Sequence, residues 1–172
     1  MNYMCPPLGR RDLRGYAKSI RKTLGLQNTL KFPVLELFEA LPDLINDNSL
    51  YCGCISDSEW IAPNVHAYYD LEENCVLVRE SVYQGAYAGN GRDRMTITHE
   101  CCHVLLLHHS HLTLTRTFEA NIPAYRDPEW HAKCLAGELM VPHDLVRNMT
   151  PSEVATACGV SLPAARYQLG VK

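Results

Sequence analysis

The sequence predicts an α+β fold in which a small sheet, antiparallel or mixed, packs with helices. Helical periodicity of apolar residues occupies both ends of the chain, and β-rich residues fill the stretch HAYYDLEENCVLVRE between them. This order of helices, sheet and helices is typical of the α+β class. With 172 residues, of which 47% are hydrophobic, the chain is long enough to bury one core.

The first two helices are expected within residues 8–45. The segment from Leu8 to Leu24 carries an amphipathic pattern, and Gly25 follows it as a stop signal. Its apolar stripe consists of Leu13, Tyr16, Ala17, Ile20 and Leu24. Pro33 suits the first turn of the second helix, which is expected to end before Pro42. The apolar face of that helix is Leu35, Phe38 and Leu41.

The sheet and the active-site helices are expected within residues 50–142. Two strands of the β-rich stretch meet at Glu72-Glu73-Asn74. Ser81 is expected to cap a short helix, which Gly89-Asn90-Gly91 then stops. The apolar residues of this helix are Val82, Tyr83, Ala86 and Tyr87. The alternating stretch HLTLTRTF, residues 111–118, predicts a short β-segment.

Two longer helices follow. The first is expected from Met95 to about Leu107. The second begins at Asp127-Pro128-Glu129, where Asp caps the helix, Pro takes the first position and Glu lies in the positive first turn. It is expected to run to Val141 and to stop at Pro142.

Residues 149–172 are expected to form a two-helix appendage that begins with the capping box Thr150-Pro151-Ser152-Glu153. The spacing of a helix-turn-helix motif is present at Ala155, Gly159 and Ala165. In such a motif the second helix faces DNA, but here it carries few basic residues for phosphate contacts. We therefore expect a helix-turn-helix-like cap on a main domain of residues 1–148, and no direct nucleic-acid binding.

Composition and cysteine spacing favour a cytoplasmic protein. The first residues lack the apolar core of a secretory signal, and no stretch approaches the ~20 apolar residues of a membrane span. The eight cysteines are scattered, so most are expected to be reduced, packed thiols. No membrane partner is expected.

The charge is unevenly distributed along the chain, although the net charge is only −3. Residues 1–31 hold seven Lys or Arg against Asp12 alone, whereas residues 32–90 hold ten Asp or Glu against Arg79. A basic helix packed beside an acidic surface explains this pattern, and a docking face for a partner is the alternative.

The stretch THECCHVLLLHH, residues 98–109, concentrates side chains that can bind metal or perform catalysis. His99 and His103 are four residues apart, so they share one face of a helix, where two imidazoles can hold zinc. Glu100 follows His99, so its carboxylate lies beside the metal that the two histidines would hold. A general base that acts on a metal-activated water must lie there. The alternative is a helix with two packed core histidines, which the apolar flanks disfavour because unpartnered polar groups are costly to bury.

A catalytic zinc site needs a third protein ligand. His109 lies ten residues after His99, which is the spacing found in metzincins. If the helix continues, however, the side chain of His109 points about 100° away from the direction midway between His99 and His103. His108 and His111 fit less well.

Glu129 is the better candidate for the third ligand, because it opens a later helix with enough intervening chain to return beside the first. The small residues Ala132 and Ala136 on the same face permit a close approach of the two helices. Glu119 and Glu138 compete for this role. An alternative role for Glu129 is that of a carboxylate favoured by the helix dipole.

Two blocks of the sequence resemble the ImmA/IrrE family of metallopeptidases. The first is GRDRMTITHECCH, residues 91–103, followed by LLLH, and the second is EWHAKCLAGELMVP, residues 129–142. The resemblance covers roughly residues 60–170. It implies a zincin-like active-site helix, a zinc ion held by His99, His103 and Glu129, and Glu100 as the base.

One departure from the family concerns Cys102, where a small residue, commonly glycine, is usual. Cys102 is expected to pack against the helix of Glu129, and the alternative is an extra ligand or a redox brake. Cys101 is expected in the core. Tyr125 and His131 are expected to be structural and not to stabilise a transition state.

The resemblance implies a zinc-dependent intracellular endopeptidase with one Zn²⁺ per chain. Its protein substrate is expected to be a helix-turn-helix transcriptional repressor, or another regulatory protein, of a phage or mobile element. The alternative is a non-proteolytic metal-binding sensor or interaction module on the same fold. Glu100 favours the enzyme, because a pure binding site does not need that base.

Overall fold

The computed structural model describes residues 2–109, without the side chain of His109, and residues 113–172. Its helices are α1 (Arg10–Thr23), α2 (Val34–Leu44), α3 (Glu80–Tyr87), α4 (Gly91–His109), α5 (Pro128–Met140), α6 (Pro151–Cys158) and α7 (Leu162–Leu169), with a 3-10 turn η1 (Ala124–Arg126). Its strands are β1 (Asn2–Met4), β2 (Tyr51–Ile55), β3 (Ala67–Asp70), β4 (Cys75–Arg79) and β5 (Thr115–Thr117). The predicted α+β class, with a small sheet and surrounding helices, is confirmed.

The larger sheet is mixed and has the strand order β2-β4-β3. β4 pairs in parallel with β2 and antiparallel with β3, so β3 is an edge strand. The predicted hairpin is confirmed, and Asn74 in its turn has a φ of 49°, a conformation that Asn tolerates better than most residues. Val76 and Val78 of β4 are fully buried.

Two strands were not predicted. β2 contains Gly53, which weakens a strand pattern, and the ring of Tyr51 occupies the space where a side chain on Gly53 would lie. β1 is three residues long and pairs antiparallel with β5. Within the predicted segment HLTLTRTF only Thr115–Thr117 is a strand. The first two residues of the segment, which precede Thr113, lie outside the described part of the chain.

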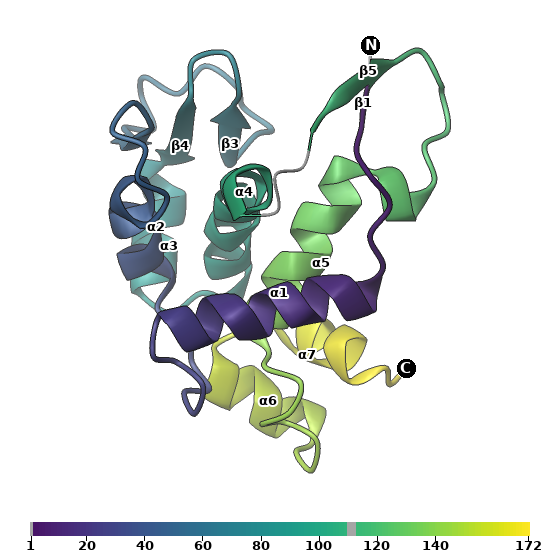
Figure 1. Ribbon diagram of the computed structural model, residues 1–172. Coiled ribbons are helices and arrows are strands. Elements are labelled where there is room, and N and C mark those ends of the chain that lie inside the picture. The colour runs from purple at the N-terminus through teal and green to yellow at the C-terminus, as the bar shows by residue number, and fades with distance from the viewer. Residues whose placement is uncertain (1, 110–112) are drawn as a thin grey trace.

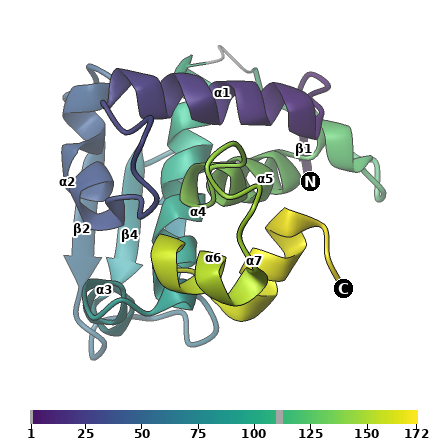
Figure 2. The ribbon, with the colours of Figure 1, turned by 90° about the horizontal axis from the view of Figure 1, so that it is seen from below.

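α4 occupies the centre of the molecule, with the sheet, α2 and α3 on one side and α5 on the other (Figure 1). α1 crosses α5, and α6 and α7 cover the end of the molecule opposite the strands (Figures 1 and 2). One core joins these elements, and the largest side chains that are completely buried in it include Phe32, Leu13, Leu41, Ile97, Leu105, Leu135 and Leu139. None of the described helices is long and apolar enough to cross a membrane.

Several helix boundaries differ from the predictions, among them those of α1, which begins at Arg10 and not at Leu8. α2 continues through Pro42 to Leu44, and its buried face includes Leu37 in place of the half-buried Leu35. α3 is not capped by Ser81: the Ser81 N–H donates to Asp57 Oδ1 at 2.9 Å, so a distant loop supplies the capping carboxylate.

α4 begins at Gly91, four residues before the predicted start. The side chain of Asn90 explains the difference, because its Oδ1 accepts from the N–H groups of Arg92 (3.0 Å) and Asp93 (3.1 Å). The predicted start of α5 is confirmed: Asp127 Oδ1 accepts from the Glu129 N–H at 3.0 Å, and Pro128 is the first helical residue.

The C-terminal helices pack onto the rest of the chain. Arg94 Nε donates to the carbonyl of Gly159 in the α6–α7 turn at 2.9 Å. A Cβ at Gly91 would lie 2.6 Å from the backbone nitrogen of Ser161, so this close approach requires glycine. Arg10 of α1 binds Gln168 and Tyr167 of α7. These contacts fasten α7 to α1 and the α6–α7 turn to α4.

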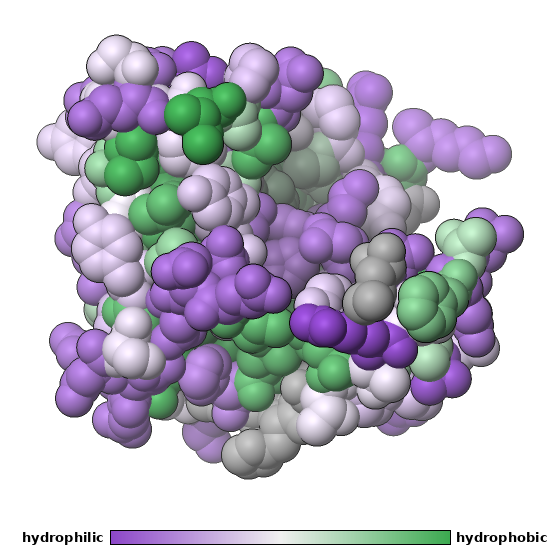
Figure 3. All heavy atoms as spheres, turned by 90° about the horizontal axis from the view of Figure 1, so that it is seen from above, coloured by the Kyte–Doolittle hydropathy of each residue, from purple (hydrophilic) through white to green (hydrophobic). Residues whose placement is uncertain are grey.

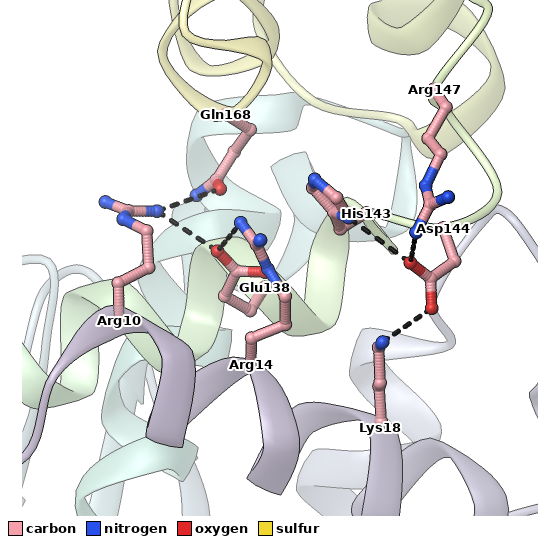
Figure 4. Close-up of polar contacts among 8 residues, drawn as sticks. All are labelled: Arg10, Arg14, Lys18, Glu138, His143, Asp144, Arg147 and Gln168. Carbon is pink, nitrogen blue, oxygen red and sulfur yellow. Dashed lines mark hydrogen bonds and ion pairs between the residues drawn. The ribbon is translucent and has the colours of Figure 1, made fainter.

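Glu138 in α5 is buried, with 1% of its side chain exposed, and two arginines of α1 bind it. Arg14 Nε lies 2.8 Å from Glu138 Oε2, and Arg10 Nη1 lies 3.1 Å from Oε1 (Figure 4). A second cluster beside it is more exposed, with Lys18 and Arg147 around Asp144 (Figure 4). Glu138 therefore fastens α5 to α1.

Replacing Glu138 with Ala is expected to lower the free energy of unfolding by about 3 kcal/mol, because two arginines lose the buried carboxylate that binds them both. Asp144→Ala is the matched control, with an expected loss below about 1 kcal/mol, since 44% of its side chain is exposed. Urea unfolding of the two variants measures both values. Equal losses would mean that burial does not strengthen the Glu138 cluster.

All eight cysteines are free thiols, as expected. Five of them are buried: Cys5, Cys101, Cys102, Cys134 and Cys158. Burial raises the pKa of each of these thiols, which keeps them protonated and unreactive.

Candidate metal centre

α4 and α5 bring His99, His103 and Glu129 together. The two histidines are one helical turn apart on α4, and their rings lie 4.8 Å apart at an angle of 88°. Glu129, in the first turn of α5, reaches both imidazoles: its Oε2 is 3.1 Å from His99 Nε2, and its Oε1 is 3.2 Å from His103 Nε2. The two imidazoles hold the pKa of the Glu129 carboxyl well below its usual range, His103 contributing most.

The three side chains fit a metal ion better than they fit one another. The Nε2 atoms of His99 and His103 lie 3.2 Å apart. If both nitrogens donate a proton to Glu129, neither is left to accept from the other, so hydrogen bonds cannot satisfy all three contacts at once. Ligand atoms around a tetrahedral zinc ion are about 3.3 Å apart, given bonds of about 2.0–2.1 Å. The group can therefore hold a divalent metal ion through two nitrogens and one carboxylate.

Glu100 is not a member of this group but lies beside it. Its Oε2 accepts a hydrogen bond from the backbone N–H of Tyr69 in β3 at 2.9 Å, which fixes the carboxylate between the sheet and α4. Burial raises the pKa of Glu100 to about 7, and the nearby Glu129 adds to this, while His99 and the Tyr69 N–H oppose it. A carboxyl in this state can both accept and return a proton near neutral pH.

The structure separates the other predicted candidates from this group. Glu138 is bound by arginines on α1, and His108 Nε2 lies 3.9 Å from Asp47 Oδ2. Glu119 is exposed and does not belong to the metal-binding group found among the described residues. His111 and the side chain of His109 lie outside the described residues.

Cys101 and Cys102 are both fully buried in the core, as expected for packed residues. Ala132 and Ala136 of α5 are also fully buried, and α4 and α5 share the most extensive contact in the molecule. The small side chains thus allow the close helix approach that brings Glu129 to the two histidines.

His131 is a structural residue that ties the N-terminal segment to the start of α5. It is completely buried, its Nε2 contacts the carbonyl of Tyr125 at 2.9 Å, and its Nδ1 lies 3.0 Å from Cys5 Sγ. Because a carbonyl only accepts, Nε2 carries the proton and Nδ1 accepts from the thiol. The Cys5 N–H also donates to the Arg126 carbonyl at 3.0 Å. These contacts hold the chain immediately before Glu129.

The candidate centre opens into a cleft of about 900 Å³. β3 and the turn after it line one wall, and β1 with residues 120–122 lines the other. Figure 3 views the face at the strand end of the molecule, where hydrophobic and hydrophilic side chains lie side by side around a hollow. Glu100, His103 and Glu129 all line the cleft, so a ligand in it reaches the metal-binding group.

Two contributors to the site were not predicted: the Tyr69 N–H and Cys5. A backbone donor has no signature in the sequence, and Cys5 is separated from His131 by most of the chain.

Neither a scan against protein-family models nor a search of curated proteins finds a match for this chain. The resemblance to the ImmA/IrrE family therefore rests on the two sequence blocks that carry it.

Proposed function

We propose that this protein is a zinc-dependent endopeptidase that acts in the cytoplasm. The observation that carries the proposal is the arrangement of Glu100, which lies beside three convergent metal ligands and is oriented by the sheet. A site that only binds metal does not need a carboxylate held in that place. The resemblance of residues 91–108 and 129–142 to the ImmA/IrrE family supports the same activity.

The residues have distinct tasks in this reaction. His99, His103 and Glu129 would hold the zinc ion, which when bound supplies Lewis acidity to a water molecule and to the peptide carbonyl. Glu100 takes the proton from the attacking water at its carboxylate and then returns it to the leaving amine. The Tyr69 N–H keeps the Glu100 carboxylate in one orientation during both transfers.

The edge strand β3 offers a binding site for an extended peptide. In an antiparallel pair, only every second residue of β3 forms backbone hydrogen bonds with β4, and the bond from the Arg79 N–H to the His66 carbonyl shows which series does so. Tyr69 is three residues after His66 and falls outside that series. Its backbone groups therefore point to the opposite edge of β3, where its N–H donates to Glu100. A substrate strand added at this edge would place its backbone beside the base.

The substrate is proposed to be a regulatory protein, in particular a helix-turn-helix repressor of a phage or mobile element. To test the activity, zinc-loaded protein is incubated with repressors encoded beside it, and the products are identified by mass spectrometry. A single cut, prevented by chelation and restored by zinc, is the expected result. Stoichiometric zinc with every tested repressor intact would favour a non-proteolytic sensor or interaction module.

A further inference from the structure

The charged side chains of Asp, Glu, Lys and Arg that line the cleft all have the same sign. Among the described lining residues the carboxylates are Asp70, Glu72, Glu100, Asp127 and Glu129, and neither Lys nor Arg is present. Glu100 and Glu129 belong to the proposed centre. Asp70, Glu72 and Asp127 lie outside the centre and add their negative charge to the same cleft.

Among the residues that the structure describes, these three carboxylates have no cationic partner. Asp70 Oδ1 accepts from the N–H groups of Glu72 and Glu73, and Asp127 caps α5, so both are fixed in place by backbone donors. In the described part of the chain, none of Asp70, Glu72 and Asp127 takes part in an ion pair. Carboxylates of one sign in a concave site produce a focused negative potential, which attracts a cationic ligand.

A second group of lining residues is aliphatic. Leu106 and Leu107 follow His103 along α4, and Leu114 and Ile122 come from the chain that connects α4 to α5. Tyr68 and Leu71 add apolar surface beside the carboxylates of the β3–β4 turn. The cleft thus combines an apolar lining, which can bury a large side chain, with unpaired negative charge.

We propose that the cleft selects an extended polypeptide segment in which Lys or Arg residues flank a bulky aliphatic residue. This inference rests on the proposed function and specifies its substrate class. The unpaired carboxylates bind the cationic side chains, the leucines and Ile122 bind the aliphatic one, and β3 pairs with the backbone between them. A nucleic-acid strand does not fit the cleft, because its phosphates would meet the same carboxylates.

The test uses three quenched fluorescent peptides of equal length and the full, zinc-loaded chain. The first peptide has a central Leu flanked by Lys, the second has the same Leu flanked by Glu, and the third has Asn in place of Leu between Lys residues. Cleavage is measured with the wild-type protein. Binding is measured independently by fluorescence anisotropy with the Glu100→Gln variant, so affinity is determined even where no bond is cut.

The Lys-flanked Leu peptide is expected to bind and to be cleaved at least tenfold better than either of the others. Raising the salt concentration to about 0.5 M is expected to remove most of its advantage over the Glu-flanked peptide. Combining Glu72→Gln with Asp70→Asn is expected to reduce the advantage over the Glu-flanked peptide about fivefold, since each substitution removes one partly exposed negative charge from the cleft. Glu73→Gln is the matched control: it lies in the same turn but does not line the cleft, and it should preserve the preference.

The outcomes separate the inference from the proposed function. Preferential binding of the Lys-flanked Leu peptide without cleavage would support the substrate class and contradict the endopeptidase. Cleavage of all three peptides at similar rates would support the endopeptidase and overturn the inference. An effect of Glu73→Gln as large as that of the combined Glu72→Gln and Asp70→Asn substitutions would also overturn it, because the charge would then act from the whole turn and not from the cleft.

Discussion

Glu100→Gln is expected to abolish peptide cleavage while the protein still binds one zinc ion per chain. Gln has nearly the same size as Glu and retains an oxygen that accepts from the Tyr69 N–H, so the geometry of the site should persist. It cannot take a proton from water, however, and loss of a general base typically costs about 10²–10⁴-fold in rate. The ligands His99, His103 and Glu129 are unchanged, which explains the retained metal.

The measurement combines kcat/KM on a cleaved substrate with elemental analysis of the same preparation. Because zinc content is determined separately, loss of activity cannot be confused with loss of metal. Cleavage by the variant at more than a tenth of the wild-type rate would remove Glu100 from the role of base. Loss of zinc would instead make Glu100 a ligand, contrary to its hydrogen bond with β3.

Glu129→Ala has the second large expected effect, which is the loss of both metal binding and activity. Residues that only orient a metal ligand typically contribute 10–100-fold to affinity, so removal of a ligand should weaken zinc binding by more than about 100-fold. The two histidines that remain cannot complete a three-ligand site. Isothermal titration with zinc gives the affinity, and a protease assay at saturating zinc gives the activity.

Glu119→Ala is the matched control for this experiment, since Glu119 is an exposed carboxylate on the same connection between α4 and α5. It should bind zinc as the wild-type protein does. Unchanged zinc affinity in Glu129→Ala would contradict the assignment of the third ligand, and a loss in Glu119→Ala alone would transfer that role to Glu119.

The sequence predicted the parts of the fold that have local causes. Asp127-Pro128-Glu129 contains its own start signal, because the cap, the first proline and the acidic first turn all act within one helical turn. The hairpin around Asn74 is equally local. β2 was not predicted, since its pairing with β4 is parallel and depends on chain far away in sequence.

The candidate site, too, was predictable only where its cause is local in the sequence. The four-residue spacing of His99 and His103 determines that they share a helix face, so the pair is readable in the sequence. Glu129 was one of several candidates, and only the close packing of α4 against α5 shows which carboxylate reaches the imidazoles. Cap assignments failed where the partner was distant: Asp57, not Ser81, binds the start of α3.

The metal content of the wild-type protein tests the central claim most directly. The protein is purified without chelators, incubated with excess zinc, dialysed, and measured by elemental analysis against its concentration. The arrangement of His99, His103 and Glu129 predicts about one zinc ion per chain. A protein that retains no zinc after this treatment would show that the three side chains only contact one another, and the endopeptidase proposal would fail with them.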